Sequence, residues 1–284
     1  MILVTGAAGK TGVAVIKALL KKNAAVRALI RRTEQAEELL SMGVASALVG
    51  GDLTEPDGLS QAMDGISSIY HLCPNMHPAE IDIGRLAIQA ALECGVGHFV
   101  YHSVLHPQTE KMIHHWQKMR VEELLFESGL NFTILQPAPY MQNILAGRDS
   151  IVNKGLYRVP YPPQASISLV DLEDLGEVAA IVLTEPGHSG SVYEIVGTTA
   201  LTQAQTAAQI GEALGRDVAV EEIELAAWKF GAEKAGLDNY ALENLYNMFR
   251  YYALHGLAGN PYVLRCLLGR EPNSIATFVR REFI

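Results

Sequence analysis

Residues 5–12, with the sequence TGAAGKTG, place three glycines between a short hydrophobic run at 2–4 and an amphipathic stretch. Glycines let the chain turn sharply and let a diphosphate approach the backbone, where the N–H groups at the start of a helix favour an anion. A strand, a glycine-rich turn and a helix in this order are typical of dinucleotide-binding proteins. We therefore predict that the cofactor-binding residues of this turn are Thr5, Gly6, Ala8, Gly9, Lys10, Thr11 and Gly12.

The tripeptide Gly9-Lys10-Thr11 also matches the end of the loop that binds nucleoside triphosphates. That loop requires a glycine five residues before Gly9, and Val4 occupies this position. The sequence therefore does not predict a kinase or an ATPase.

Short β-branched runs alternate with longer amphipathic stretches from residue 1 to residue 137. This alternation predicts an α/β Rossmann fold, a doubly wound parallel sheet with helices on both faces, followed by a smaller, mostly helical C-terminal lobe. The strands lack strict polar alternation, as expected when helices cover both faces of the sheet. The predicted strands are 2–5, 25–30, 45–49, 67–72, 98–103 and 131–136, and the predicted helices are 11–22, 33–42, 55–63, 79–94 and 110–128.

The pattern loosens after Pro137, and residues 157–163 carry three prolines and two tyrosines, which predicts a loop. A strand at 167–170, a helix at 172–185 and a strand at 191–196 are expected to return to the sheet. Thr202 and Gln205 form a capping-box pattern ahead of a helix. The aromatic-rich tail from 225 to 284 is expected to be helical, with its aromatic side chains packed in a core. We expect 1–145 to form the cofactor-binding core, with 165–200 returning to it, and 146–164 and 201–284 to form the smaller substrate or partner lobe.

The 22 Lys and Arg residues against 31 Asp and Glu residues give a net charge of −9, which disfavours nucleic acid as a partner. No run of about 18 apolar residues predicts a membrane span, and no basic leader precedes the first hydrophobic run. The cysteines, Cys73, Cys94 and Cys266, form no disulfide framework. We expect a cytoplasmic protein.

The second predicted strand ends in Arg31 and Arg32, about 20 residues beyond the glycines, where an NAD site usually has an acidic residue. Two guanidinium groups suit a 2′-phosphate through charge-assisted hydrogen bonds, which predicts NADP over NAD. Lys10 could add a third positive charge, and the alternative is a solvated strand end. After the third predicted strand, Asp52 and Leu53 are expected to contact the adenine, unless Asp52 forms a turn or caps a helix.

Together, the segments TGAAGKTG, VRALIRR, GDL, HFVYHS, ILQPAPYMQN and HxxxK at 114–118 resemble the NmrA-like branch of the atypical short-chain dehydrogenases/reductases. The similarity spans about residues 1–200. The resemblance implies an NADP-binding Rossmann core with a smaller C-terminal lobe. Members of the family include quinone reductases, a dye-reducing enzyme and non-catalytic redox-sensing regulators, so the resemblance implies fold and cofactor more directly than activity.

Standard members of the wider superfamily use Ser, Tyr and Lys, with the last two spaced YxxxK. In this chain His114 occupies the tyrosine position and Lys118 the lysine position, on one helix face. The resemblance implies that Lys118 binds the nicotinamide ribose and that Ser103 contacts a substrate oxygen, unless Ser103 only ends a strand and Lys118 is a solvated helix residue. His114 could transfer protons near neutral pH. Glu122 is expected to pair with Lys118 or with a neighbour in solvent.

The resemblance also implies that the main chain of Pro137 and Ala138 faces the carboxamide of nicotinamide. Tyr140 and Asn143 would then border the substrate cavity, and Tyr140 could replace the missing acid. At the end of the fourth predicted strand, the main chain of His71 and Leu72 is expected to contact the cofactor ribose.

Metal binding is not predicted, because His98, His102 and His106 lie on a predicted strand and its continuation, where a spacing of four does not align them. A GxSxG nucleophile motif is absent as well. The sequence thus favours an NADPH-dependent oxidoreductase that reduces a quinone or another small carbonyl or flat aromatic substrate by direct hydride transfer. The alternative is a non-catalytic NADP(H)-binding redox sensor that regulates a protein partner.

Overall fold

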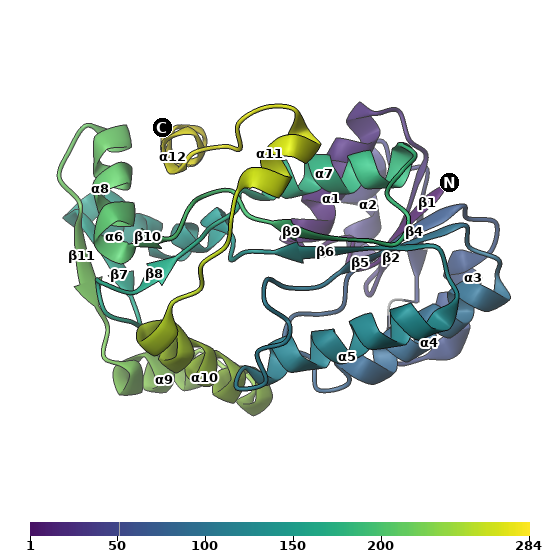
Figure 1. Cartoon of the computed structure of the whole chain (residues 1–284), viewed down its shortest axis with the longest axis horizontal. Helices are drawn as coiled ribbons and strands as arrows, with labels where there is room; N and C mark the ends of the chain where they lie inside the picture. Colours follow the sequence, from purple (N-terminus) through teal and green to yellow (C-terminus); the bar gives the residue numbers. More distant parts are fainter. Residues whose placement is uncertain (51) are drawn as a thin grey trace. The chain divides into compact units, whose positions relative to one another are not determined.

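In the computed structural model, which describes residues 1–50 and 52–284, seven strands form a central sheet in the order β3-β2-β1-β4-β5-β6-β9 (Figure 1). The pairs β1–β2, β1–β4, β2–β3, β4–β5 and β5–β6 are parallel, with Ile2 opposite both Val26 and Ser68. The strand order reverses at β1, which creates the switch point where α/β proteins bind ligands. The strands are β1 Ile2–Val4, β2 Val26–Ile30, β3 Ser46–Val49, β4 Ser68–His71, β5 His98–His102, β6 Phe132–Pro137 and β9 Ser191–Ile195.

Helices cover both faces of this sheet, as the alternating pattern predicts. Figure 1 shows α1 and α7 on one side and α3, α4 and α5 on the other. The predicted Rossmann architecture is therefore confirmed, and the strands of this sheet end within one residue of the predicted ones. The strand predicted at 167–170 is wrong, because only Ser166–Ile167 form a strand there, β8, and it lies outside this sheet. The helices are α1 Lys10–Lys21, α2 Glu34–Ser41, α3 Pro56–Met63, α4 Glu80–Glu93, α5 Ile113–Ser128 and α7 Leu172–Thr184.

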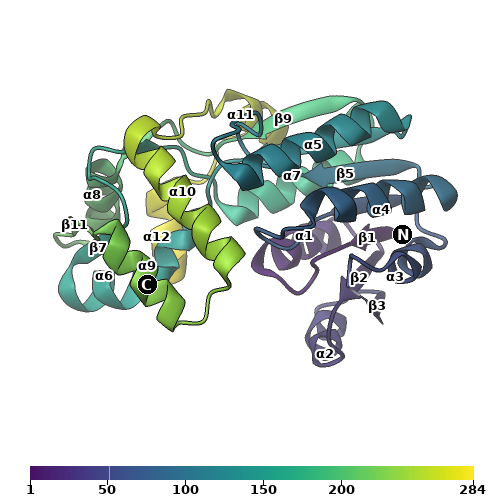
Figure 2. The ribbon, with the colours of Figure 1, turned by 90° about the horizontal axis from the view of Figure 1, so that it is seen from below.

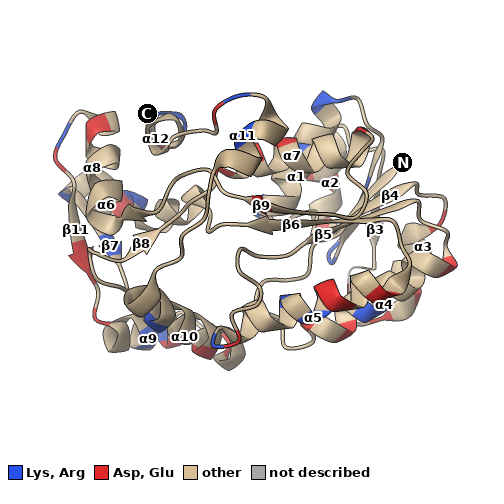
Figure 3. Ribbon diagram, in the orientation of Figure 1, with Lys and Arg blue, Asp and Glu red and all other residues tan. Residues whose placement is uncertain are grey.

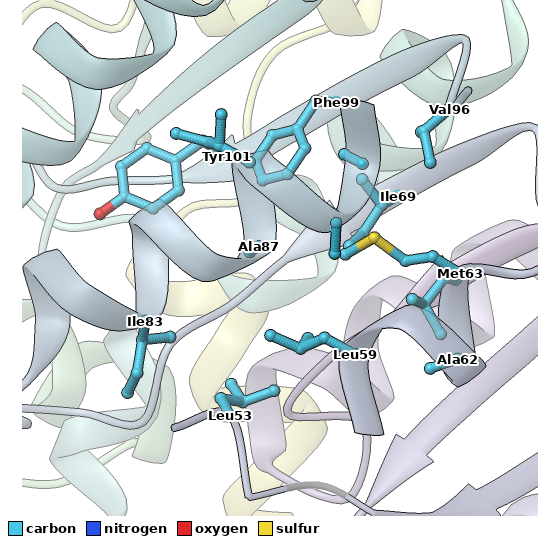
Figure 4. Packing of buried hydrophobic residues seen from close by; sticks show 14 of the residues in the cluster. Leu53, Leu59, Ala62, Met63, Ile69, Ile83, Ala87, Val96, Phe99 and Tyr101 are labelled. Carbon is cyan, nitrogen blue, oxygen red and sulfur yellow. The ribbon is translucent and has the colours of Figure 1, made fainter. Parts of the chain in front are cut away.

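The core of the sheet lies between the strands and the helices α3, α4 and α5. Phe99 and Tyr101 on β5 and Met63 on α3 are fully buried in one cluster, and Ile83 and Ala87 on α4 pack into the same cluster (Figure 4). Figure 3 shows that charged residues gather on the helices and loops, whereas the strands of the sheet are almost entirely uncharged. Burial of these apolar side chains therefore fixes which face of each helix meets the sheet.

Two glycines allow close packing between helices. A Cβ atom at Gly84 on α4 would lie 2.7 Å from both γ-carbons of Val121 on α5, and these two helices run side by side (Figure 2). A Cβ atom at Gly176 on α7 would lie 2.7 Å from the carbonyl oxygen of Ala14 on α1. Each glycine therefore lets two helices of the same layer approach more closely than any other residue would allow.

The chain divides into two compact units. The first comprises residues 1–108, 114–136 and 175–193, and the second comprises 109–113, 137–174 and 194–284. Residues 137–145, 165–174 and 194–200, which are predicted to belong to the core, fall in the second unit. For residues 137–145 the reason is their pairing with the segment around Val170: its N–H donates to the carbonyl of Pro139, and its carbonyl accepts from the N–H of Met141.

Two short pairs of strands organise the second unit. β7, Leu156–Val159, pairs in parallel with β11, Ala219–Glu222, and β8, Ser166–Ile167, pairs antiparallel with β10, Leu201–Thr202. The predicted loop at 157–163 is thus wrong for its first three residues. Tyr157 and Val159 are buried on either side of exposed Arg158, which is the alternation of a strand, and the prolines follow only after it.

The rest of the second unit is helical, as predicted for its tail. The capping box is confirmed, since the N–H of Gln205 donates to Thr202 Oγ1 and the N–H of Thr202 donates to Gln205 Oε1. Among the aromatic residues of the tail, Tyr252 is buried and the rings of Trp228 and Phe249 lie 4.8 Å apart. The elements are η1 Met141–Gly147, α6 Arg148–Lys154, α8 Gln203–Leu214, α9 Leu225–Lys234, α10 Asn239–His255, α11 Tyr262–Leu268 and α12 Ile275–Phe283.

The C-terminal helix is held by a buried carboxylate of the same unit. Asp171 accepts two hydrogen bonds from the guanidinium of Arg281 on α12, at 2.9 and 3.0 Å, and one from the amide of Gln142. The side chain of Asp171 is fully buried, so this bidentate pair satisfies a charge that water does not reach. In the part of the chain that the structure describes, no helix is long and apolar enough to cross a membrane.

We predict that Gly84→Ala destabilises the protein by roughly 1–3 kcal/mol, because the new methyl group must displace Val121. Gly231 on α9 is the matched control, since a Cβ atom there would have nothing within 4 Å. Gly231→Ala should instead raise stability by about 0.5–1 kcal/mol through helix propensity. Thermal unfolding measures both changes, and a gain in Gly84→Ala would contradict the packing argument.

Candidate active site

The turn between β1 and α1 has the conformation that its glycines predict. Gly6 lies in the left-handed region with φ of 57°. A Cβ atom at Gly12 would collide with the carbonyl oxygen of Gly6 and lie 2.8 Å from the Cα of Ala7. The N–H of Gly9 donates to the carbonyl of Gly6 and closes the turn. Side chains at positions 6 and 12 would therefore open the turn or push α1 away.

The N-terminus of α1 is suited to an anion. Gly9 is the N-cap and supplies no side-chain hydrogen bond, and the first turn of the helix contains no acidic residue. Gly6, Ala8, Gly9 and Lys10 are exposed, so their backbone is accessible to a ligand. Free N–H groups and the positive end of the helix dipole favour a phosphate at this position.

Other residues that are predicted to bind the cofactor hold this turn in place. The hydroxyl of Thr5 donates to the carbonyl of Leu72 at 2.9 Å and accepts from its N–H at 2.7 Å, which ties the end of β1 to the end of β4. Leu72 packs under Gly6, where a Cβ atom would lie 2.9 Å from Leu72 Cδ2. His71 is fully buried, and burial lowers its pKa to about 4, so its ring is neutral near neutral pH.

Arg31 and Arg32 follow the last residue of β2 and are exposed. Their backbone N–H groups both donate to Gln35 Oε1, which fixes the chain at this point. Neither guanidinium forms an ion pair with a carboxylate within residues 1–50 or 52–284. Their donors are therefore available to an anionic ligand beside the glycine turn.

Asp52 makes a local turn, which was one of the two alternatives for this residue. Its Oδ1 accepts from the N–H of Thr54 at 3.0 Å and from its hydroxyl at 2.6 Å. These hydrogen bonds lower the pKa of Asp52, and the nearby charges of His77 and Arg31 lower it further. Leu53 is buried in the core beside α3. The side chains of both residues are thus used by the protein itself, and a contact to the adenine stays a prediction.

Lys118 pairs with a residue that sequence spacing did not indicate. Its Nζ donates to Glu80 Oε1 at 2.9 Å and to the carbonyl of His102 at 3.4 Å. Glu80 is the first residue of α4, is buried, and also accepts from the hydroxyl of Tyr101 at 2.9 Å. The expected pairing of Lys118 with Glu122 is therefore wrong, because a buried carboxylate from another helix takes the ammonium group.

His114 is buried together with His115, and their rings meet edge to face at 4.5 Å. Burial lowers the pKa of His114 to about 2, and His115 and Lys118 contribute to this lowering. The imidazole is therefore neutral near neutral pH. This environment argues against the expectation that His114 takes up and releases protons in that range.

Ser103, directly after β5, donates its hydroxyl hydrogen to Glu122 Oε1 on α5. Gln136 Nε2 donates to both carboxylate oxygens of Glu122 at 3.0 Å. All three side chains are buried. Burial raises the pKa of Glu122, although the hydrogen bonds and the charge of Lys118 act against this. The sequence pattern did not indicate this cluster, because Glu122 was expected to pair with Lys118 or with a neighbour in solvent.

The remaining predicted residues belong to the second unit. Pro137 ends β6, and the N–H of Ala138 donates to the carbonyl of Ile195 at 3.0 Å. Tyr140 is half-buried and precedes η1, and Asn143 is exposed within it. Their roles at a substrate cavity stay predictions. Within the described residues, no group of three or more His, Cys, Asp or Glu side chains is arranged to hold a metal ion.

Comparison with known proteins decides the family. The model of the NmrA-like family matches residues 1–273 of this chain. The chain belongs to the NmrA-like family. This membership confirms the resemblance seen in the sequence motifs. The matched region also includes residues 201–273, which the motifs did not cover.

Among NmrA-like relatives, the chain is 30% identical to an NAD(P)H azoreductase of Xenophilus azovorans, over 99% of this chain and 97% of that protein. It is 26% identical to quinone oxidoreductase 2 of Escherichia coli (strain K12), over 100% of this chain and 99% of that protein. A crystal structure of an NADPH-dependent quinone oxidoreductase from Escherichia coli, complexed with NADPH, superposes with a TM-score of 0.86, covers all of both chains and is 26% identical.

We predict that Lys118→Met lowers the free energy of unfolding by about 3–5 kcal/mol, because it leaves the carboxylate of Glu80 buried without a cation. The double variant Lys118→Met/Glu80→Gln should recover part of this loss. Exposed Lys17 on α1 provides the control, and Lys17→Met should change stability little. Urea unfolding of the parent, Lys118→Met, Glu80→Gln, the double variant and Lys17→Met measures the coupling. Additive losses in the double variant would show that the pair does not interact as its geometry indicates.

Proposed function

We propose that the chain is an NADPH-dependent reductase that transfers hydride to a quinone or to another small carbonyl or flat aromatic substrate. The chain is an oxidoreductase of the NAD(P)H-using type, as its similarity to an azoreductase and a quinone oxidoreductase indicates. One observation supports NADPH in particular: the exposed N-terminus of α1 has no side-chain cap, and the chain also has Arg31 and Arg32, which make no ion pair within the described residues.

The residues present fit NADPH. The exposed backbone of Gly6, Ala8 and Gly9 and the first turn of α1 would hold the diphosphate. Arg31 and Arg32 would hold the 2′-phosphate through charge-assisted hydrogen bonds. An acidic side chain, which would repel that phosphate, is absent from both positions. This arrangement supports NADP(H) as the preferred cofactor over NAD(H).

Lys118 would hold the nicotinamide ribose. An ammonium group has three donors, and the structure directs one to Glu80 and one to the carbonyl of His102. A third donor is then available to a ribose hydroxyl. Glu80 and Tyr101 fix the position of the ammonium group, so its role is to orient the ribose.

When bound, NADPH supplies a hydride. A quinone suits this chain because it accepts hydride into a delocalised oxyanion, whose protonation does not demand the tyrosine that the YxxxK pattern would supply. His114 in the tyrosine position is neutral and buried. Ser103 is the side chain that we assign to contact with the substrate oxygen, and the role of Tyr140 stays a prediction.

We predict that Arg31→Ala and Arg32→Ala each weaken NADPH binding by roughly tenfold or more, since a hydrogen bond to a charged group contributes about 1.5–3 kcal/mol. NADH binding should change little, because NADH lacks the 2′-phosphate. Calorimetric titration of both cofactors measures the selectivity. Arg85→Ala on α4 is the control, because Arg85 is exposed and pairs with Asp82 on its own helix. Equal losses for NADH and NADPH would refute the phosphate assignment.

We further predict that the purified protein oxidises NADPH when a quinone is added, measured by the loss of NADPH absorbance across a panel of quinones. The double variant Lys118→Met/Glu80→Gln should raise the KM for NADPH by roughly tenfold, because one hydrogen bond from a charged group is lost. Tight NADPH binding without turnover of any quinone would overturn the reductase proposal and would favour a sensor.

A further inference from the structure

Glu122 is a buried carboxyl group whose hydrogen-bond partners are uncharged. Its side chain is 3% exposed and receives its hydrogen bonds from Ser103 and Gln136. Within the residues that the structure describes, no cation lies within ion-pair distance of it, in contrast to Glu80, which pairs with Lys118 at 2.9 Å. A buried carboxylate without a cation is costly, and ionisable groups in such environments are candidates for a functional role.

The cluster lies at the edge of the sheet where α/β proteins bind ligands. Ser103 directly follows β5, and its N–H donates to the carbonyl of Leu135 on β6 at 2.8 Å. Gln136 is the next residue of β6, and Glu122 reaches both strands from α5. The carboxyl ends of parallel strands beside a switch point are the usual place for a substrate.

The hydrogen bond between Ser103 and Glu122 determines whether the serine hydroxyl can donate a hydrogen bond to a substrate. A hydroxyl group has one hydrogen, and Ser103 directs it to Glu122 Oε1. In this state the serine presents only lone pairs, whereas a substrate oxygen that gains negative charge needs a donor. If Glu122 is protonated, its carboxyl hydrogen points to Ser103 Oγ, and the hydroxyl hydrogen of the serine turns outward.

We infer that Glu122 is a positioning residue that sets the direction of the Ser103 hydroxyl and resupplies its proton during reduction. The inference rests on the proposed function, in which NADPH provides the hydride. The O–H bond of Ser103 breaks as an O–H bond forms on the substrate oxyanion. The carboxyl O–H bond of Glu122 breaks as the serine hydroxyl is restored. Glu122 is left as a carboxylate and regains its proton from water, so one hydride and one proton reach each quinone.

The surroundings of Glu122 set the direction of the pH dependence. The groups that act on it electrostatically are Lys118 on its own helix and Tyr101 on β5. Burial raises the pKa of Glu122 and outweighs the lowering by Ser103, Gln136 and Lys118. Because the protonated form is the one that turns Ser103 into a donor, reduction is fastest below the pKa of Glu122 and slows as the pH rises through it.

The decisive experiment measures kcat/KM for quinone reduction as a function of pH. The parent protein should lose about tenfold per pH unit above the pKa of Glu122. In Glu122→Gln the amide N–H donates to Ser103 at every pH but cannot resupply its proton, so kcat/KM should be lower than that of the parent at low pH and this decline should disappear. Glu123→Gln is the matched control, since Glu123 is the next residue on α5, is partly exposed and pairs with Arg120. An unchanged decline in Glu122→Gln would overturn the inference.

A second measurement does not depend on turnover. Infrared spectra of the protein alone, recorded as the pH is lowered, should show the carbonyl band of a protonated carboxyl group that titrates above the ordinary glutamate range, and the part of this band that belongs to Glu122 is identified by comparison with the variants. The band should persist unchanged in Glu123→Gln and lose the intensity of one carboxyl group in Glu122→Gln. If the parent protein and Glu122→Gln show the same band, Glu122 does not hold a proton in this range and the inference fails.

Ser103→Ala separates this inference from the proposed function. The variant should bind NADPH as the parent does and lose roughly 10²–10⁴-fold in kcat/KM, the usual contribution of a positioned acid. Turnover that is unaffected by Ser103→Ala would contradict the role of Ser103 and Glu122 but leave the reductase proposal standing. Failure of the parent protein to bind NADPH would overturn the reductase proposal, and the inference with it.

Discussion

The close approach of α1 to the turn before it is the constraint on which the rest of the structure depends. The backbone of Gly12 lies against the carbonyl of Gly6, and two residues later the same helix meets α7 through Gly176. The helix that would present its N-terminus to a diphosphate is therefore also the helix that fixes one layer on the sheet. A displacement large enough to open the turn would break the packing of that layer, which explains why the turn needs no side-chain cap to keep its shape.

On the opposite face of the sheet, two buried carboxyl groups, those of Glu80 and Glu122, lie close to one edge. Glu80 is balanced by the ammonium group of Lys118 and by a phenol from β5, so its charge is compensated within the network. Glu122 receives only neutral donors. The two groups therefore differ in chemistry: the first anchors a cation, and the second is hydrogen-bonded only to a serine and an amide, while burial raises its pKa. His114 takes the place of the usual tyrosine, and the titratable side chain that is hydrogen-bonded to Ser103 on this face is a carboxyl group.

The sequence predicted the sheet because β-branched runs and glycine turns act locally, and residues 2–5 or 98–103 need no distant partner to be recognised as strands. It missed β7 because the prolines that follow Val159 dominated the pattern. The pairing of Lys118 with Glu80 spans 38 residues along the chain, so no helical spacing could reveal it. For Asp52 the sequence left two interpretations open, since the side chain of an aspartate can form a local turn or can bind a ligand. Local order was thus predictable, whereas the partners of buried charges depend on tertiary contacts.

The buried histidines limit where a proton can come from. Burial lowers the pKa of His71, His102 and His114 to about 4, 3 and 2, so each ring is neutral in the folded protein near neutral pH. Below the ordinary histidine pKa of about 6.5, the unfolded chain binds protons that the folded chain does not, and the free energy of unfolding falls as the pH is lowered towards the folded values. Acid conditions that would protonate these rings therefore also destabilise the fold. A proton source that works in the stable range has to titrate above the folded pKa values of the histidines, and a buried carboxyl group with a raised pKa meets this condition.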